Sequence, residues 1–137
     1  MFDCFISYTQ ADERFATNLA QFLESQRLRT FIATLSLAPG SSWSEKIKQA
    51  LNSSKWVLFL ASRTACSSAA VQQEVGGAIF GGKRLIPIVW DMDPSLLPAW
   101  AREYQAIDLR GMTSKLVLAT MESLAQELGV RLKSCTT

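Results

Sequence analysis

The chain of 137 residues contains no histidine. This absence excludes Ser–His and Cys–His nucleophilic catalysis, histidine-ligated zinc sites and acid–base chemistry by imidazole. Three cysteines, Cys4, Cys66 and Cys135, have no CxxC spacing, so we expect reduced thiols that serve packing. If the protein is an enzyme, carboxylates must carry much of its chemistry.

Strong charge and long apolar runs are also missing. The net charge is +2 and the basic residues are scattered, so we expect no nucleic-acid partner for this domain. The longest apolar run, from Trp56 to Ala61, has the length of a strand, so no membrane association is expected. The first residues, MFDCFIS, show no basic leader, and the expected location is therefore the cytoplasm.

What the chain does contain is an alternation of apolar and amphipathic segments. We expect strands at 2–8, 29–33, 55–61, 84–90 and 105–109. We expect helices at 11–26, after the capping box at 42–45, at 65–80, around 99–104, and in a last segment with Val117, Met121, Leu124 and Leu128 in register. Near-continuous apolar strands that alternate with helices indicate a parallel sheet covered on both faces. The prediction is a single α/β domain, flavodoxin-like, with a doubly wound five-stranded parallel sheet. It spans residues 1–129, and 130–137 form a tail or the start of a linker.

In such a fold, ligands bind beyond the carboxyl ends of the strands, where the strand order reverses. With the order 2-1-3-4-5, this point lies between the first and third strands. The loops at 7–13 and 62–68 face it, and the helix that follows the second loop carries Glu74.

Glu74 is the one acidic residue between Glu45 and Asp91. Its neighbours on the same helix face are mostly tiny: Ala70, Val71, Gly77 and Ala78. One interpretation is a carboxylate at the bottom of a recess that admits a flat ligand. The other is a solvated glutamate on a surface helix whose small residues pack under the sheet.

Other motifs narrow the classes of function. The first loop lacks GxGxxG, so dehydrogenase-like dinucleotide binding is unsupported. A phospho-accepting receiver domain needs acidic residues at the ends of the first and third strands. Here those ends are Ser7-Tyr8-Thr9 and Leu60-Ala61-Ser62, without an acid, so this class is excluded. The PGSSW stretch at 39–43 is either a phosphate-binding helix start or an ordinary turn. Its Trp43 is either a stacking surface or a core residue.

Several motifs occur together and in order. They are FDCFISYTQADERFATNLAQFLE, the Pro-Gly loop within FIATLSLAPGSSWSEKIKQALNSSKWVLFLAS, Ser67-x6-Glu74, and GKRLIPIVWD followed by LP and IDL. From about Phe2 to Leu128 the chain resembles a Toll/interleukin-1 receptor (TIR) domain. The residues in these motifs are closer to those of the bacterial branch than to those of animal receptors.

The resemblance implies a cytoplasmic module that either scaffolds signalling assemblies or cleaves NAD+ at the nicotinamide–ribose bond. It implies Glu74 as the catalytic residue, with no metal and no cofactor besides NAD+ as substrate. The implied substrate-binding residues are Ser7, Tyr8, Thr9, Leu35, Gly40 and Trp43. Two positions depart from the enzymatic pattern: Ala70 stands where a Trp is frequent, and Ala33 where an Asp is frequent.

The chemistry is compatible with a single carboxylate. Nicotinamide leaves as a neutral ring, so no acid has to protonate it, unlike the leaving oxygen in ordinary glycosidases. One anion can stabilise the positive charge that develops on the ribose. The resemblance therefore implies, and this chemistry permits, an NAD+ glycohydrolase or cyclase that gives ADP-ribose or a cyclic variant. The resemblance also implies a role in bacterial anti-phage defence.

Three expectations concern partners and alternatives. The resemblance implies head-to-tail self-association with other TIR copies and a sensor or effector partner. The first alternative is a non-catalytic TIR adaptor that mediates TIR–TIR assembly. The second is a nucleoside-transferring enzyme of similar fold that also uses a glutamate.

Overall fold

The computed structural model describes the backbone of residues 2–35, 45–67 and 84–136. Its centre is a five-stranded parallel sheet with the order β2-β1-β3-β4-β5, which confirms the predicted fold class and strand order. The strands are β1 (Cys4–Thr9), β2 (Thr30–Leu35), β3 (Trp56–Leu60), β4 (Arg84–Val89) and β5 (Ile107–Asp108).

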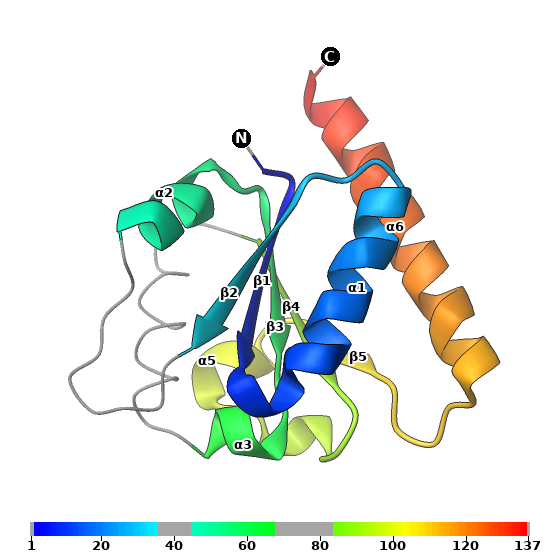
Figure 1. The fold of residues 1–137 in the computed structure, drawn as a ribbon. Coiled ribbons are helices and arrows are strands. Elements are labelled where there is room, and N and C mark those ends of the chain that lie inside the picture. The colour runs from blue at the N-terminus through cyan, green and yellow to red at the C-terminus, as the bar shows by residue number, and fades with distance from the viewer. Residues whose placement is uncertain (1, 36–44, 68–83, 137) are drawn as a thin grey trace.

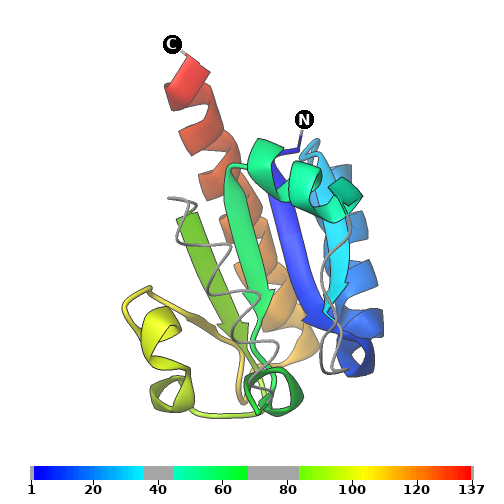
Figure 2. The same ribbon diagram turned by 90° about the vertical axis from the view of Figure 1, so that its left-hand side faces the viewer.

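Helices cover both faces of the sheet (Figures 1 and 2). The helices α1 (Glu13–Ser25) and α6 (Ser114–Thr136) lie side by side on one face. The opposite face carries α2 (Glu45–Ser53), α3 (Arg63–Cys66) and α5 (Ala99–Arg102). Two short 3-10 helices, η1 (Gln10–Asp12) and η2 (Pro94–Leu96), lie in the connections after β1 and β4. No described helix is both long enough and apolar enough to cross a membrane.

Every residue of β1 and of β3 is buried, because both faces of these central strands pack against helices. Alternate side chains of β1 contribute to different cores. Cys4, Ile6 and Tyr8 belong to the apolar cluster that includes α1 and α6, whereas Phe5 belongs to the cluster on the α2 and α5 side. The apolar runs of the sequence therefore fill two cores, one on each side of the sheet.

The turn after α1 has a left-handed residue. Arg27 adopts a φ of 67°, and its N–H donates to the carbonyl of Glu24 at 2.9 Å. The N–H of Leu28 donates to the carbonyl of Leu23 at 3.1 Å. This pair of bonds is the Schellman arrangement, which satisfies the last carbonyls of the helix and turns the chain toward β2.

Some expected boundaries differ from the structure. The fifth strand was expected at 105–109, but β5 comprises Ile107 and Asp108 because these residues alone pair with β4, at Ile88 and Val89. Of the helix expected at 65–80, α3 provides the start, and most of the remainder lies outside the described residues. The backbone of α6 stays helical through Thr136, into the segment expected as a tail, and the boundary at residue 129 stays a prediction.

Candidate functional site at the carboxyl ends of the central strands

The carboxyl ends of β1 and β3 form the point at which the chain separates to the two faces of the sheet. From β1 the chain continues through η1 into α1 on one face, and from β3 it enters α3 on the other (Figure 1). In doubly wound sheets this is the place where ligands bind. The side chains that follow these two strands are therefore the first candidates for a site.

Asp12 joins the two strand ends. The hydroxyl of Thr9, the last residue of β1, donates to Oδ2 of Asp12 at 3.0 Å. The hydroxyl of Ser62, directly after Ala61 at the end of β3, donates to the same oxygen at 2.6 Å. Ser62 Oγ also accepts from the N–H of Ala65 at 3.2 Å and so caps the start of α3. We call Thr9, Asp12 and Ser62 the Asp12 clamp.

The loop after β4 is fastened to the same helix. The main-chain N–H of Arg63 donates to both carboxylate oxygens of Asp91, at 3.0 and 3.3 Å. Nε of Arg63 donates to the carbonyl oxygen of Asp91 at 2.8 Å. The carboxyl ends of β1, β3 and β4 are thus held together by polar contacts centred on the first turn of α3.

The structure separates some of the predicted substrate-binding residues. By the alternation of β1, Ser7 and Thr9 share the face of Phe5, and both are fully buried. Tyr8 lies on the opposite face, in the core against α1 and α6, and is 6% exposed. The backbone of Leu35 ends β2 beside Thr9. The predicted catalytic Glu74 and the predicted contacts Gly40 and Trp43 lie outside the described residues, so all these roles stay predictions.

Sequence reasoning missed Asp12. It lies in the loop at 7–13 that was expected to face the switch point, but the Asp-Glu pair at 12–13 has the composition of an ordinary helix start. In fact the Asp12 side chain makes no capping bond to α1. A signal was available, because Asp12 is an acid in the loop that follows the first strand, and in a doubly wound sheet this loop lies where ligands bind.

The described cysteine thiols are not nucleophiles at neutral pH. Burial, reinforced by the charge of Asp91, raises the pKa of Cys66 to about 11. Burial, with a smaller contribution from Asp3, raises the pKa of Cys4 to about 12. Both thiols are free and stay protonated, in agreement with the packing role expected from the sequence. Among the described residues, no group of His, Cys, Asp and Glu side chains is arranged to hold a metal ion.

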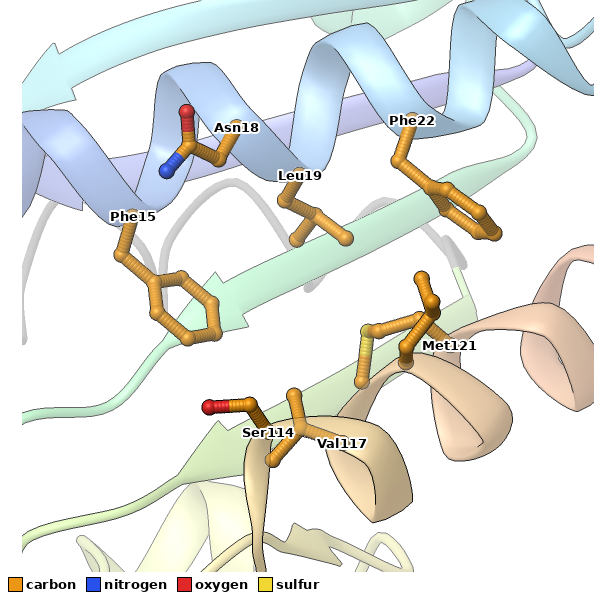
Figure 3. Close-up of a pocket in the computed structure, with 8 residues that line it drawn as sticks. Phe15, Asn18, Leu19, Phe22, Ser114, Val117 and Met121 are labelled. Carbon is orange, nitrogen blue, oxygen red and sulfur yellow. The ribbon is translucent and has the colours of Figure 1, made fainter.

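Two concavities lie elsewhere on the described surface. A groove of about 280 Å³ separates α1 from α6. Figure 3 shows Phe15, Leu19 and Phe22 of α1 pointing toward Val117 and Met121 of α6. A second hollow, of about 350 Å³, lies beside β4 and β5 and is lined by Trp56, Leu85, Ile86, Gln105, Ala106, Ile107, Leu124, Glu127 and Leu128. Neither concavity includes a residue of the Asp12 clamp.

Comparison with solved structures supports the fold. The TIR domains of the Roq1 resistosome, in an activated structure that recognises the pathogen effector XopQ, superpose with a TM-score of 0.73 at 18% identity, covering 93% of this chain and 99% of theirs. The TIR domain of the Toll-related receptor TRR-2 from Hydra magnipapillata gives 0.70 at 19% identity, covering 93% and 98%. A TIR-STING receptor from C. gigas in complex with 2',3'-cGAMP gives 0.67 at 20% identity, covering 93% of this chain and 39% of the receptor.

A flavodoxin-like domain from Synechococcus also matches, with a TM-score of 0.63 at 14% identity and coverage of 96% and 99%. No curated protein matches the chain. The family model described as "TIR domain" matches residues 4–124, which is most of the chain. The protein therefore belongs to the TIR domain family.

Proposed function

We propose that this TIR domain is an NAD+ glycohydrolase or cyclase that breaks the nicotinamide–ribose bond and releases ADP-ribose or a cyclic variant. The observation that carries the proposal is Glu74, the single acid between Glu45 and Asp91, in the segment that follows the third strand of a chain matched to the family. The absence of histidine is compatible with this reaction, because the departing nicotinamide needs no general acid.

In the proposed mechanism, the C–N bond to nicotinamide breaks and its electron pair leaves with the neutral ring. The Glu74 carboxylate stabilises the positive charge that develops on the ribose. Water then adds to the ribose carbon, or an atom of the same dinucleotide adds and closes a ring. Leu35, Gly40 and Trp43 contact the substrate. Ser7, Tyr8 and Thr9 are buried in β1 and contribute by fixing the end of that strand.

The experiment measures free nicotinamide released from NAD+ by chromatography, at high protein concentration. Glu74→Gln removes one negative charge with little change in shape, and we expect at least a hundredfold loss of activity. Glu45→Gln is the matched control, because Glu45 is exposed and its described ion pair is with Lys48 on the same helix, at 3.7 Å. Equal activity of Glu74→Gln and the wild type would remove the catalytic assignment.

Self-association is part of the proposal. We propose that copies of this domain assemble head to tail, with a sensor or effector partner as the trigger and anti-phage defence as the setting. If assembly completes the site, specific activity rises steeply with protein concentration. Measuring nicotinamide release per protomer over a hundredfold range of concentration tests this, and a flat dependence contradicts it.

A second candidate is a non-catalytic adaptor that assembles with other TIR domains. Ala70 favours it, because a ring-stacking Trp is frequent at this position in enzymatic members and is absent here. The nicotinamide-release assay described above distinguishes the enzyme from the adaptor. An adaptor self-associates without releasing nicotinamide at any concentration.

A further inference from the structure

The polar side chains at the carboxyl ends of β1 and β3 differ in their access to solvent. Ser7, Thr9 and Ser62 are each at most 1% exposed, whereas Asp12 is half-buried. Of the Asp12 clamp, Asp12 is therefore the member that a ligand arriving from solvent can touch.

The carboxylate of Asp12 is fixed through one oxygen. The hydroxyls of Thr9 and Ser62 both donate to Oδ2. A carboxylate offers about four lone-pair positions, and among the described residues no donor reaches Oδ1. Because the two bonds hold the carboxylate in one orientation, Oδ1 is a preorganised acceptor at the switch point of the sheet.

A second, independent observation lies on the same face of β1. The hydroxyl of Ser7 is fully buried, and no residue in the described part of the chain gives it a hydrogen-bond partner. Ser7 precedes Thr9 by two residues, so their side chains project from the same face about 7 Å apart. A buried hydroxyl without a partner destabilises the fold, so such a group marks a place where a water or a ligand can supply the missing hydrogen bond.

We propose that Asp12 is a ligand-binding residue, whose Oδ1 accepts a hydrogen bond from a ribose hydroxyl. The negative charge repels phosphate, so the sugar rather than the pyrophosphate of a dinucleotide lies against the end of β1. The choice of a dinucleotide as ligand rests on the proposed function. The assignment of a donor group to Oδ1 rests on the geometry of the Asp12 clamp.

The first experiment needs no substitution. The side-chain carboxyl carbon of Asp12 is followed by ¹³C NMR while ADP-ribose is added to the wild-type chain. We expect its resonance to shift with saturation, and inorganic pyrophosphate to leave it in place. No shift with ADP-ribose, or an equal shift with pyrophosphate, overturns the proposal.

The second experiment compares two neighbouring substitutions of equal charge change. Asp12→Asn keeps an oxygen that can accept from Thr9 and Ser62 but loses the carboxylate. Glu13→Gln changes an exposed carboxylate that accepts from Gln10 at 2.9 Å. We expect Asp12→Asn to weaken ADP-ribose binding at least tenfold by calorimetry, and Glu13→Gln less than threefold. Equal affinities of the two variants overturn the proposal.

The outcomes separate the two proposals. If ADP-ribose shifts Asp12 but NAD+ is not cleaved, the proposed function fails and the ligand-binding role of Asp12 stands. If NAD+ is cleaved but Asp12 does not respond to ADP-ribose, the ligand-binding role fails and the proposed function stands.

Discussion

Asp91 holds Arg63 at two places, with its carboxylate on the main-chain N–H at 3.0 and 3.3 Å and its carbonyl oxygen on Nε at 2.8 Å. Asp91 follows β4 and Arg63 begins α3, so the contact joins segments 28 residues apart in the sequence. The first turn of α3 is therefore anchored from the β4 side as well as by Ser62.

Asp91→Ala removes the carboxylate that caps the Arg63 N–H. Because both residues are exposed, we expect the free energy of unfolding to fall by about 1 kcal/mol. Urea unfolding measures the change. Glu122→Ala, at an exposed position of α6, is the control and is expected to stay within about 0.5 kcal/mol of the wild type. A loss no larger than that of the control contradicts the anchoring role.

The buried thiol of Cys4 makes stability depend on alkaline pH. Its pKa is about 12 in the folded chain against an ordinary value of 9.0, so between these values the unfolded chain releases a proton that the folded chain keeps. The stabilisation is complete below pH 9 and is lost as the pH rises toward 12. Cys4→Ala lacks this dependence, because alanine does not titrate.

The measurement is urea unfolding of the wild type and Cys4→Ala at pH 8 and pH 10.5 under reducing conditions. At pH 8 we expect the variant to be less stable by about 1–2 kcal/mol, because Cys4 is fully buried. At pH 10.5 the difference is expected to shrink or reverse. Other titrating groups are common to both proteins and cancel, so a difference that stays constant with pH would argue against the raised pKa.

Arg27→Gly tests the left-handed turn after α1. A non-glycine residue at a φ of 67° carries a steric cost of about 1 kcal/mol that glycine avoids. The backbone bonds of the turn do not involve the side chain, so we expect the variant to be more stable by about 0.5–1 kcal/mol. Thermal unfolding measures the gain, and Arg27→Ala, which keeps the Cβ, should show little of it.

Gly111→Ala makes the opposite change, from glycine to a residue with a Cβ, at another left-handed position. Gly111 has a φ of 72°, and a Cβ added there would meet no atom within 4 Å. Any destabilisation in Gly111→Ala therefore arises from the backbone conformation alone, and we expect about 1 kcal/mol. An unchanged stability in both Arg27→Gly and Gly111→Ala would show that these turns relax without cost.

Arg110 controls the ionisation of Asp108. Its Nε donates to both carboxylate oxygens, at 3.0 and 3.1 Å, and its Nη2 donates to Oδ2 at 2.8 Å. These bonds favour the ionised form and hold the pKa of Asp108 below its ordinary value of 3.8. In Arg110→Gln we expect this pKa to rise toward the ordinary value.

A ¹³C NMR titration of the carboxyl groups measures the change, and Asp93 serves as an internal reference. The pKa of Asp93 is also lowered, but mainly by the backbone N–H of Ser95, with Arg110 as a smaller cause. Its pKa should therefore rise less than that of Asp108 when Arg110 is replaced. Equal pKa shifts at Asp93 and Asp108 would contradict the conclusion that Arg110 acts mainly on Asp108.

Much of the fold was predictable because its signals are local and repeated. The mostly apolar stretch at 4–9 and the continuous apolar run at 56–60 indicate strands covered on both faces, and both are buried along their whole length. The end of the sheet was harder to predict, because the apolar segment around Ile107 looks like a full strand. Its length is set by pairing with β4, which no local pattern encodes.

The candidate site was predictable in location but not in its residues. The switch point follows from strand order, whereas the contact of Ser62 with Asp12 joins residues 50 apart in the sequence. Tyr8 shows the same limit. The pattern of β1 could not decide which of two buried faces carries each side chain, and the fold places Tyr8 away from Ser7 and Thr9.

The brevity of β5 leaves part of the outer flank of β4 without a neighbouring strand among the described residues. Ile88 and Val89 pair with β5, while Arg84 to Pro87 pair with β3 alone. Pro87 offers no N–H, and Arg84 adds an exposed charge whose guanidinium carbon lies 5.4 Å from the ring centre of Trp56. Both features disfavour the addition of a foreign strand along this part of β4, so a second copy placed here would contact it through side chains and not by extending the sheet.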